Sequence, residues 1–115
     1  MSMSKTMNII FNKNEDNMKL LVSAMKQKKN IVEMGGGQKN INKQHEKGKL
    51  TARERLNKIF DKDSKTLDLG TFAAEGLYVE YGGCPSAGVV VQIGYINGKI
   101  CIVVANDSTV KSGAW

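Results

Sequence analysis

The sequence predicts an α/β chain in which a basic, helical first half precedes a β-rich second half. Residues 1–65 contain 15 of the 17 lysines and arginines, whereas residues 66–115 contain only two. The second half instead contains two apolar runs, 89–96 and 99–105, on either side of Asn97-Gly98. A length of 115 residues leaves room for one domain at most.

Asn97-Gly98 between β-forming residues predicts a two-residue hairpin, because a type I′ turn requires a positive φ at both central positions. In that register Ile96 opposes Lys99 and Tyr95 opposes Ile100. Both faces of the hairpin are then mostly apolar, so we expect cover on both sides. Such a hairpin needs more sheet and more cover than this chain supplies, which indicates that the chain is part of something larger.

We expect residues 1–13 to form a disordered N-terminus, residues 14–65 a helical segment, and residues 66–115 the first strands of a domain. The first helix is expected to begin near Asn14, since apolar residues then recur at helical spacing at Met18, Leu21, Val22 and Met25. Its lysines favour a docking helix with a solvated basic face over a helix that contacts nucleic acid.

Two shorter helices are predicted before the strands. Gln38–Lys47 is a polar helix that Gly48 ends at the C′ position. Thr51 and Glu54 form a capping box that starts the next helix, whose apolar stripe is Leu56, Ile59 and Phe60. Residues 66–69 are expected to form a short strand, residues 72–81 a loop with an extended portion, and residues 82–88 turns.

Four features of the sequence are candidate binding sites. The glycines 35–37 lack the Lys-Ser/Thr ending of a phosphate loop, which favours a hinge or a close helix approach over phosphate binding. His45 has no second ligand at metal spacing and is interpreted as a surface or interface residue. Arg53 and Arg55 are interpreted as helix surface or ion pairs, with contact to a phosphate-bearing ligand or a partner subunit as the alternative. The turn after the last strand, 106–115, could direct backbone amides at a ligand.

The remaining composition excludes several classes of protein. Two cysteines make no disulfide framework; Cys84 lies in a turn, Cys101 is expected to be a buried strand residue, and free thiols suit a reducing cytoplasm. No apolar run approaches the ~20 residues of a membrane helix, and a secretory signal is not expected. Paired carboxylates, a Cys-His pair or a nucleophile elbow are not evident, so these residues alone do not predict a complete enzyme.

Two segments of the chain contain long motifs. The first runs from Gly35-Gly36-Gly37-Gln38-Lys39 to Gln44-His45-Glu46-Lys47-Gly48-Lys49-Leu50-Thr51-Ala52-Arg53-Glu54-Arg55. The second combines Ala87-Gly88-Val89-Val90 with Val104-Ala105-Asn106-Asp107-Ser108-Thr109-Val110-Lys111-Ser112-Gly113. Together they resemble one family, the carboxyltransferase β subunits of biotin-dependent acyl-CoA carboxylases. The second pattern is closer to the methylcrotonyl-CoA and geranyl-CoA branch than to the propionyl-CoA branch.

The resemblance implies an incomplete crotonase-like fold of ββα units, with residues 66–115 as the first strands of a truncated carboxyltransferase N-terminal domain. The implied enzyme moves a carboxyl group from carboxybiotin, held on a partner subunit or domain, to an acyl-CoA of the methylcrotonyl or propionyl type. The implied partners are a biotin carboxylase/biotin carrier subunit and further copies of the protein, in the cytoplasm. Backbone amide pairs stabilise the enolates in that family, and the resemblance places them after Trp115, so we expect no catalytic residue here.

Lys111, Ser112 and Gly113 follow the last strand, and from this position we expect them to approach the substrate. We expect no bound metal. Two other functions stay open: a small basic nucleic-acid-binding module, and an assembly subunit without chemistry. The charge asymmetry favours the nucleic-acid module, but its helices lack interleaved aromatic residues.

Overall fold

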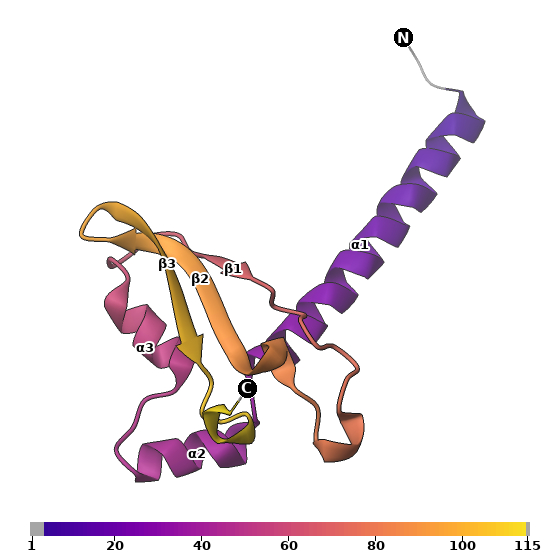
Figure 1. Cartoon of the computed structure of the whole chain (residues 1–115). Coiled ribbons are helices and arrows are strands. Elements are labelled where there is room, and N and C mark those ends of the chain that lie inside the picture. The colour runs from indigo at the N-terminus through magenta and orange to yellow at the C-terminus, as the bar shows by residue number, and fades with distance from the viewer. Residues whose placement is uncertain (1–3, 115) are drawn as a thin grey trace. The chain divides into compact units, whose positions relative to one another are not determined.

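The chain divides into two compact units, Met1–Ile31 and Val32–Trp115, and the computed structural model describes residues 4–114. Figure 1 labels the main elements in chain order: α1 (Lys5–Glu33), α2 (Gln38–Glu46), α3 (Ala52–Ile59), β1 (Leu67–Leu69), β2 (Val89–Ile96) and β3 (Lys99–Asn106). Three short 3₁₀ turns cover Val79–Tyr81, Pro85–Gly88 and Lys111–Gly113.

The first helix is longer than the sequence analysis predicts. It begins at Lys5, so the expected start near Asn14 is wrong, and residues 5–13 are helical where disorder was expected; residues 1–3 lie outside the described residues. Ser4 provides the physical reason. Its hydroxyl accepts a hydrogen bond from the Met7 N–H (3.2 Å), and serine is among the preferred N-cap residues.

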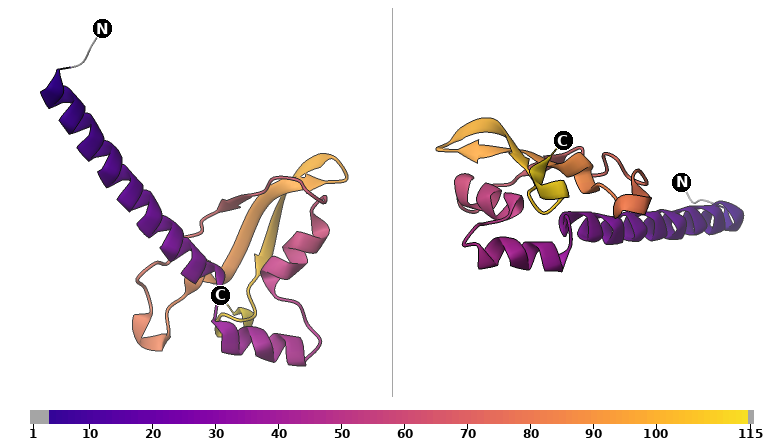
Figure 2. Two further views of the ribbon diagram at one scale, coloured as in Figure 1. Left: turned by 180° about the vertical axis from the view of Figure 1, so that it is seen from behind. Right: turned by 60° about the horizontal axis from the view of Figure 1, so that its bottom comes forward.

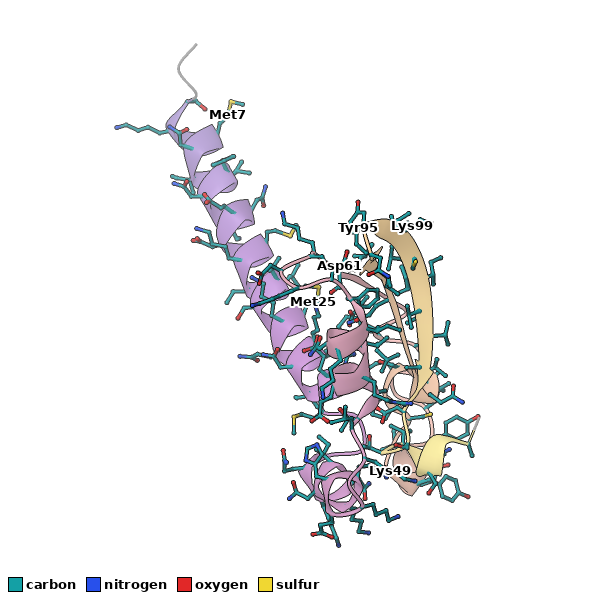
Figure 3. All side chains as sticks on the ribbon, turned by 90° about the vertical axis from the view of Figure 1, so that its left-hand side faces the viewer. Met7, Met25, Lys49, Asp61, Tyr95 and Lys99 are labelled. Carbon is teal, nitrogen blue, oxygen red and sulfur yellow. The ribbon has the colours of Figure 1, made fainter. Side chains whose placement is uncertain are left out.

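The apolar side chains of α1 in the first unit are exposed. Met7 and Met25, which Figure 3 labels along this helix, have exposed fractions of 56% and 46%. A groove that includes Phe11, Met18 and Val22 follows α1, and every residue that lines it belongs to this one helix. The groove is therefore an open helix surface and not an enclosed site.

The hairpin has the predicted register. β2 and β3 pair antiparallel with Ile96 opposite Lys99 and Tyr95 opposite Ile100, and β1 adds to the other edge of β2. Asn97 and Gly98 have φ values of 51° and 77°, as a type I′ turn requires.

Asp61 holds this turn from the end of α3. Its two carboxylate oxygens accept hydrogen bonds from the backbone N–H groups of Asn97 (2.7 Å) and Gly98 (2.8 Å), and its own N–H donates to the Tyr95 carbonyl. Figure 3 places Asp61 beside Tyr95 and Lys99 at the turn end of the hairpin. The carboxylate therefore fixes where the hairpin meets the helix.

The core lies between α3 and one face of the sheet. It contains Ala52, Leu56 and Phe60 of α3 with Val90 of β2, and Ile96, Val103 and Ala105 pack against it. Gly94 makes this packing possible, because a Cβ there would lie 2.6 Å from the Phe60 ring. A glycine inside a strand is typical of such a close approach.

The other face of the sheet is apolar and exposed. Figure 2 shows α3 on one side of the hairpin, whereas the expectation was cover on both sides. Among the described residues, Ile100, Ile102 and Val104 keep exposed fractions of 67%, 64% and 57%. β3 is also the edge strand of the sheet. We call this surface, together with Leu67 and Tyr95, the outer sheet face.

The connection between β1 and β2 contains no strand within residues 70–88, so the extended portion expected at 72–81 is wrong. Residues at positive φ, including Ala74, Tyr78 and Gly82, turn the backbone instead. The Ser86 hydroxyl donates to the Thr71 carbonyl at 2.8 Å and ties the two ends of the loop together. Cys101, expected to be buried, is half-buried.

No helix among the described residues is long and apolar enough to cross a membrane.

Candidate functional site

The glycine triplet contacts the turn that follows β3. A Cβ on Gly36 would lie 1.8 Å from the carbonyl oxygen of Thr109, so only glycine allows this approach. The Gly36 N–H donates to the Thr109 hydroxyl oxygen at 2.9 Å. Asn40, in the first turn of α2, donates from its amide to the carbonyls of Gly36 (3.0 Å) and Thr109 (3.2 Å). The glycines therefore make a close approach, but to the turn after β3 and not to a helix as the sequence analysis expects.

Asp107 and Thr109 form the buried side of this contact. Their exposed fractions are 9% and 5%. One carboxylate oxygen of Asp107 accepts from both the N–H (3.0 Å) and the hydroxyl (2.6 Å) of Thr109. The hydroxyl thus donates to Asp107 while it accepts from Gly36, which fixes its orientation. Sequence motifs about 70 residues apart meet here, and hydrogen bonds join the turn to the glycine triplet and to α2.

A second set of contacts joins α2 to α3. The predicted capping box is present: the Thr51 hydroxyl accepts from the Glu54 N–H (3.3 Å), and the Glu54 carboxylate accepts from the Thr51 N–H (2.9 Å). His45 Nε2 lies 2.8 Å from the same carboxylate. The Thr51 N–H, with His45 acting in the same direction, lowers the pKa of Glu54 below its usual value, and partial desolvation opposes the shift. His45 is therefore a structural link between two helices.

Arg53 joins α3 to the sheet. Its guanidinium donates to Asp68 at 2.9 Å, and the Gln92 amide donates to the other oxygen of that carboxylate at 2.6 Å. The ion-pair interpretation of Arg53 is correct. Arg55 instead donates to the Asn106 carbonyl at 3.2 Å, next to the turn after β3.

The three predicted substrate-binding residues form a strained turn. Lys111, Ser112 and Gly113 have φ values of 47°, 56° and 82°, a run of left-handed residues of which only the last is glycine. Each non-glycine residue in this region costs on the order of 1 kcal/mol, and such strain clusters at functional sites. The Lys111 ammonium lies 4.1 Å from the centre of the Tyr78 ring, within range of a cation–π contact.

Two adjoining cavities lie between this turn and the helices α2 and α3. The first, of about 310 Å³, is lined by Asn40, Lys43, Gln44, Lys47, Ser108, Thr109, Lys111 and Ser112. The second, of about 460 Å³, is lined by Gln44, Lys49, Leu50, Arg55 and Ser108. They share Gln44 and Ser108, and we refer to them together as the α2 cleft. Figure 1 shows the C-terminal turn beside α2.

The α2 cleft brings together residues that the sequence analysis treated separately. Lys111 and Ser112 were predicted as site residues, whereas Gly113 does not line the cleft. Arg55 lines it, which favours the anion-contact alternative for that side chain. Lys43 in α2, its C-cap Lys47, and Lys49 in the loop after it were missed, because nothing in this polar stretch indicates which side chains face the rest of the protein. Their spacing, four residues apart on one helix face for Lys43 and Lys47, was the available signal.

The cleft offers cations and hydroxyls but no acid–base pair. Within residues 4–114 no group of three or more His, Cys, Asp or Glu side chains could hold a metal ion. The geometry is suited to binding an anion.

Comparisons with known proteins identify the family to which the sequence motifs of this chain belong. The family model described as carboxyl transferase domain matches residues 43–115, more than half of the chain. The chain belongs to the carboxyl transferase family. A probable mitochondrial methylcrotonoyl-CoA carboxylase β chain of Drosophila melanogaster is 41% identical over 105 residues, which cover 91% of this chain and 18% of that protein.

Solved structures of the family have the same fold. The β subunit of Pseudomonas aeruginosa geranyl-CoA carboxylase matches with a TM-score of 0.77 and 28% identity, covering 90% of this chain and 19% of that one. The transcarboxylase 12S hexamer with methylmalonyl-CoA and methylmalonic acid bound matches with a TM-score of 0.73 and 33% identity, covering 81% and 18%. The resemblance to acyl-CoA carboxyltransferase β subunits and the expected crotonase-like fold are confirmed.

The chain spans about a fifth of the length of the proteins it matches. The outer sheet face is consistent with that short span, because apolar strand residues of this kind are covered in a complete domain.

Proposed function

We propose that this chain is part of a carboxyltransferase that moves a carboxyl group from carboxybiotin to an acyl-CoA of the methylcrotonyl or propionyl type. The observation that carries the proposal is the contact between the glycine triplet and the Asp107–Thr109 turn. This contact joins the two motifs on which the family resemblance rests. The residues that follow this contact are Lys111, Ser112 and Gly113, and its hydrogen bonds support a role for them in positioning a substrate.

The contribution of these residues is binding and positioning. We assign Lys111 and Ser112 to the substrate and Gly113 to the backbone turn that presents them. We propose that the bond-making groups belong to other parts of the enzyme. No step through biotin follows from these residues.

The proposed partners are a biotin-bearing subunit and further copies of the protein. The transcarboxylase neighbour is described as a hexamer, which supports a homo-oligomer here. The thiols of Cys84 and Cys101 are free, which suits a reducing compartment, and we propose the cytoplasm.

Precipitation from native cells with an antibody to this segment tests the proposal. We expect a denaturing gel to show a product several times larger than 12.6 kDa and a streptavidin blot to detect a co-precipitated biotinylated protein. A product of this size with no biotinylated partner would contradict the proposal. A biotinylated partner that associates stably, without carboxyl transfer, would instead support an assembly subunit.

A further inference from the structure

We propose that Tyr78 is a positioning residue for Lys111: its ring holds the ammonium of that side chain where the substrate binds. This rests on the proposed function, which assigns Lys111 to the substrate. The contact itself is a feature of the structure, in which the Lys111 ammonium lies 4.1 Å from the centre of the Tyr78 ring.

The ring orients the Lys111 ammonium without neutralising it. Within residues 4–114 this ammonium forms no ion pair, and the face of an aromatic ring attracts a cation although the ring carries no net charge. Arg53 is the opposite case, because the carboxylate of Asp68 at 2.9 Å balances its charge. A cation that is oriented by a ring keeps its full charge for an oxygen atom of the substrate.

The ring of Tyr78, and not its hydroxyl, makes the contact with Lys111. The hydroxyl makes no hydrogen bond with any group in residues 4–114, and the residue as a whole is 51% exposed. Phenylalanine is therefore the conservative replacement, because it keeps the ring that attracts the cation and loses only the hydroxyl.

Both residues of the contact have a left-handed backbone, with φ values of 56° at Tyr78 and 47° at Lys111. Non-glycine residues persist in this conformation where the surrounding contacts determine it. The Tyr78 carbonyl accepts hydrogen bonds from the N–H groups of Tyr81 (2.9 Å) and Gly83 (2.8 Å). The Lys111 carbonyl accepts one from the Ala114 N–H (3.1 Å). Backbone hydrogen bonds therefore support both ends of the contact.

The loop that carries Tyr78 is joined to the turn that carries Lys111 at a second place. At the end of that loop, the Gly88 carbonyl accepts a hydrogen bond from the Asp107 N–H at 2.9 Å. A Cβ on Gly88 would lie 3.8 Å from Cγ1 of Val110, so the two segments are neighbours there. Two connections restrict the turn more than one does, and the ring provides the connection at the substrate-binding lysine.

The variants Y78F and Y78L, made in the whole protein, test the role of the ring. Both keep a non-glycine residue at a φ of 56°, but only Y78F keeps the ring. Y81L is the matched control, because Tyr81 lies in the same loop, is 75% exposed and stacks on no cation within the described residues. We expect Y78L to raise the KM for the acyl-CoA about 2- to 5-fold with kcat unchanged. Y78F and Y81L should keep a KM near that of the wild type.

The same replacement in a K111Q background separates positioning from a general structural effect. If the ring acts through the ammonium, Y78L has no further effect on the KM of the K111Q enzyme. A KM that rises as much from K111Q to Y78L/K111Q as from the wild type to Y78L would overturn the inference. An unchanged KM in Y78L would overturn it as well, and both results would leave the proposed function intact.

Hydrogen exchange in the whole protein measures the contact without the reaction. The reporter is the Ala114 N–H, which donates to the Lys111 carbonyl. We expect its exchange to accelerate about 2- to 5-fold in Y78L and to stay near the wild-type rate in Y78F. This pattern in a protein without carboxyl transfer would support Tyr78 as the positioning residue of Lys111 and reject the proposed function. Equal rates in the wild type and Y78L would overturn the inference.

K111Q provides the reciprocal measurement, which decides the matter when Y78L does not fold. It removes the cation and leaves the ring in place. The reporter is then the Gly83 N–H, which donates to the Tyr78 carbonyl at 2.8 Å. We expect its exchange to accelerate by the same about 2- to 5-fold, and an unchanged rate would overturn the inference.

Discussion

Replacing Gly36 with alanine tests the contact that joins the two family motifs. The added Cβ would lie 1.8 Å from the Thr109 carbonyl oxygen and 2.6 Å from its carbonyl carbon. Non-bonded atoms prefer a separation of about 3.5 Å, so one backbone segment has to move by more than about 1 Å. Because the collision is with backbone, a side-chain rotation cannot relieve it.

Such a movement breaks three hydrogen bonds: one from the Gly36 N–H and two from the Asn40 amide. At a net value of about 1 kcal/mol for each bond, the free energy of opening the turn falls by about 3 kcal/mol. This change corresponds to about a 100-fold increase in the population of the open turn.

Hydrogen exchange in the whole protein measures that population. The reporters are the N–H groups of Thr109 and Val110, which donate to the side chain and the carbonyl of Asp107. We expect their exchange to accelerate about 100-fold in G36A. The control is G37A, whose Cβ has no atom within 4 Å but whose φ is 90°. With a ψ of 166°, Gly37 lies in a region essentially restricted to glycine, where strain costs about 1–3 kcal/mol. Because this strain displaces no atom of Thr109, a smaller acceleration is expected at the Thr109 and Val110 N–H groups. Exchange in G36A that is no faster than in G37A would refute the steric argument.

Three further predictions concern the helix junction, the hairpin and the sheet. Asp61→Ala removes both acceptors of the Asn97-Gly98 turn and should destabilise the hairpin by about 1–3 kcal/mol in denaturant unfolding. The control is Asp63→Asn, two residues further on, because Asp63 has a φ of 60° that asparagine also tolerates; equal effects would contradict the role of Asp61. Since the pKa of Glu54 is lower in the folded state, its contribution to stability is present above its unfolded-state pKa and is lost as pH falls through the lower folded value. Acidification from pH 6 towards pH 3 should therefore lower the melting temperature more in the wild type than in E54Q. If the melting temperatures of the two proteins fell in parallel with pH, the Glu54 carboxylate would not contribute to this loss of stability. The 115-residue polypeptide expressed alone should aggregate through the outer sheet face, and I100T/I102T/V104T should shift it towards monomer in size-exclusion chromatography; a sharp, cooperative melt of the unmodified monomer would falsify this prediction.

Local signals in the sequence predicted the parts of the fold that neighbouring residues determine. Asn97-Gly98 predicted the hairpin and its register, and Thr51 with Glu54 predicted the start of α3, because a turn or cap is defined within a few residues. The start of α1 was missed although its signal is also local. The polar composition of residues 1–13 predicted disorder, and the one helix-start signal in that stretch, the N-cap Ser4, was not recognised.

The tertiary contacts of the site could be predicted only in part. The close approach at the glycine triplet was expected, but nothing in the sequence named Thr109 as its partner, since the two lie 73 residues apart. Lys111 and Ser112 were expected from their place after a strand. The lysines of α2 were not, because the face of a uniformly polar helix that meets the protein depends on contacts such as Asn40 with Thr109.

Carboxyl transfer by the whole protein is the most direct test of the central claim. The protein, purified from its own cells with its biotin-bearing partner, is incubated with ATP, labelled bicarbonate and a panel of acyl-CoA thioesters, and the labelled products are identified by mass spectrometry. We expect a carboxylated methylcrotonyl-type or propionyl-type acyl-CoA whose formation stops when avidin sequesters biotin. No labelled acyl-CoA from any member of the panel, with the partner's biotin shown to be carboxylated, would contradict the proposal that this segment belongs to an acyl-CoA carboxyltransferase.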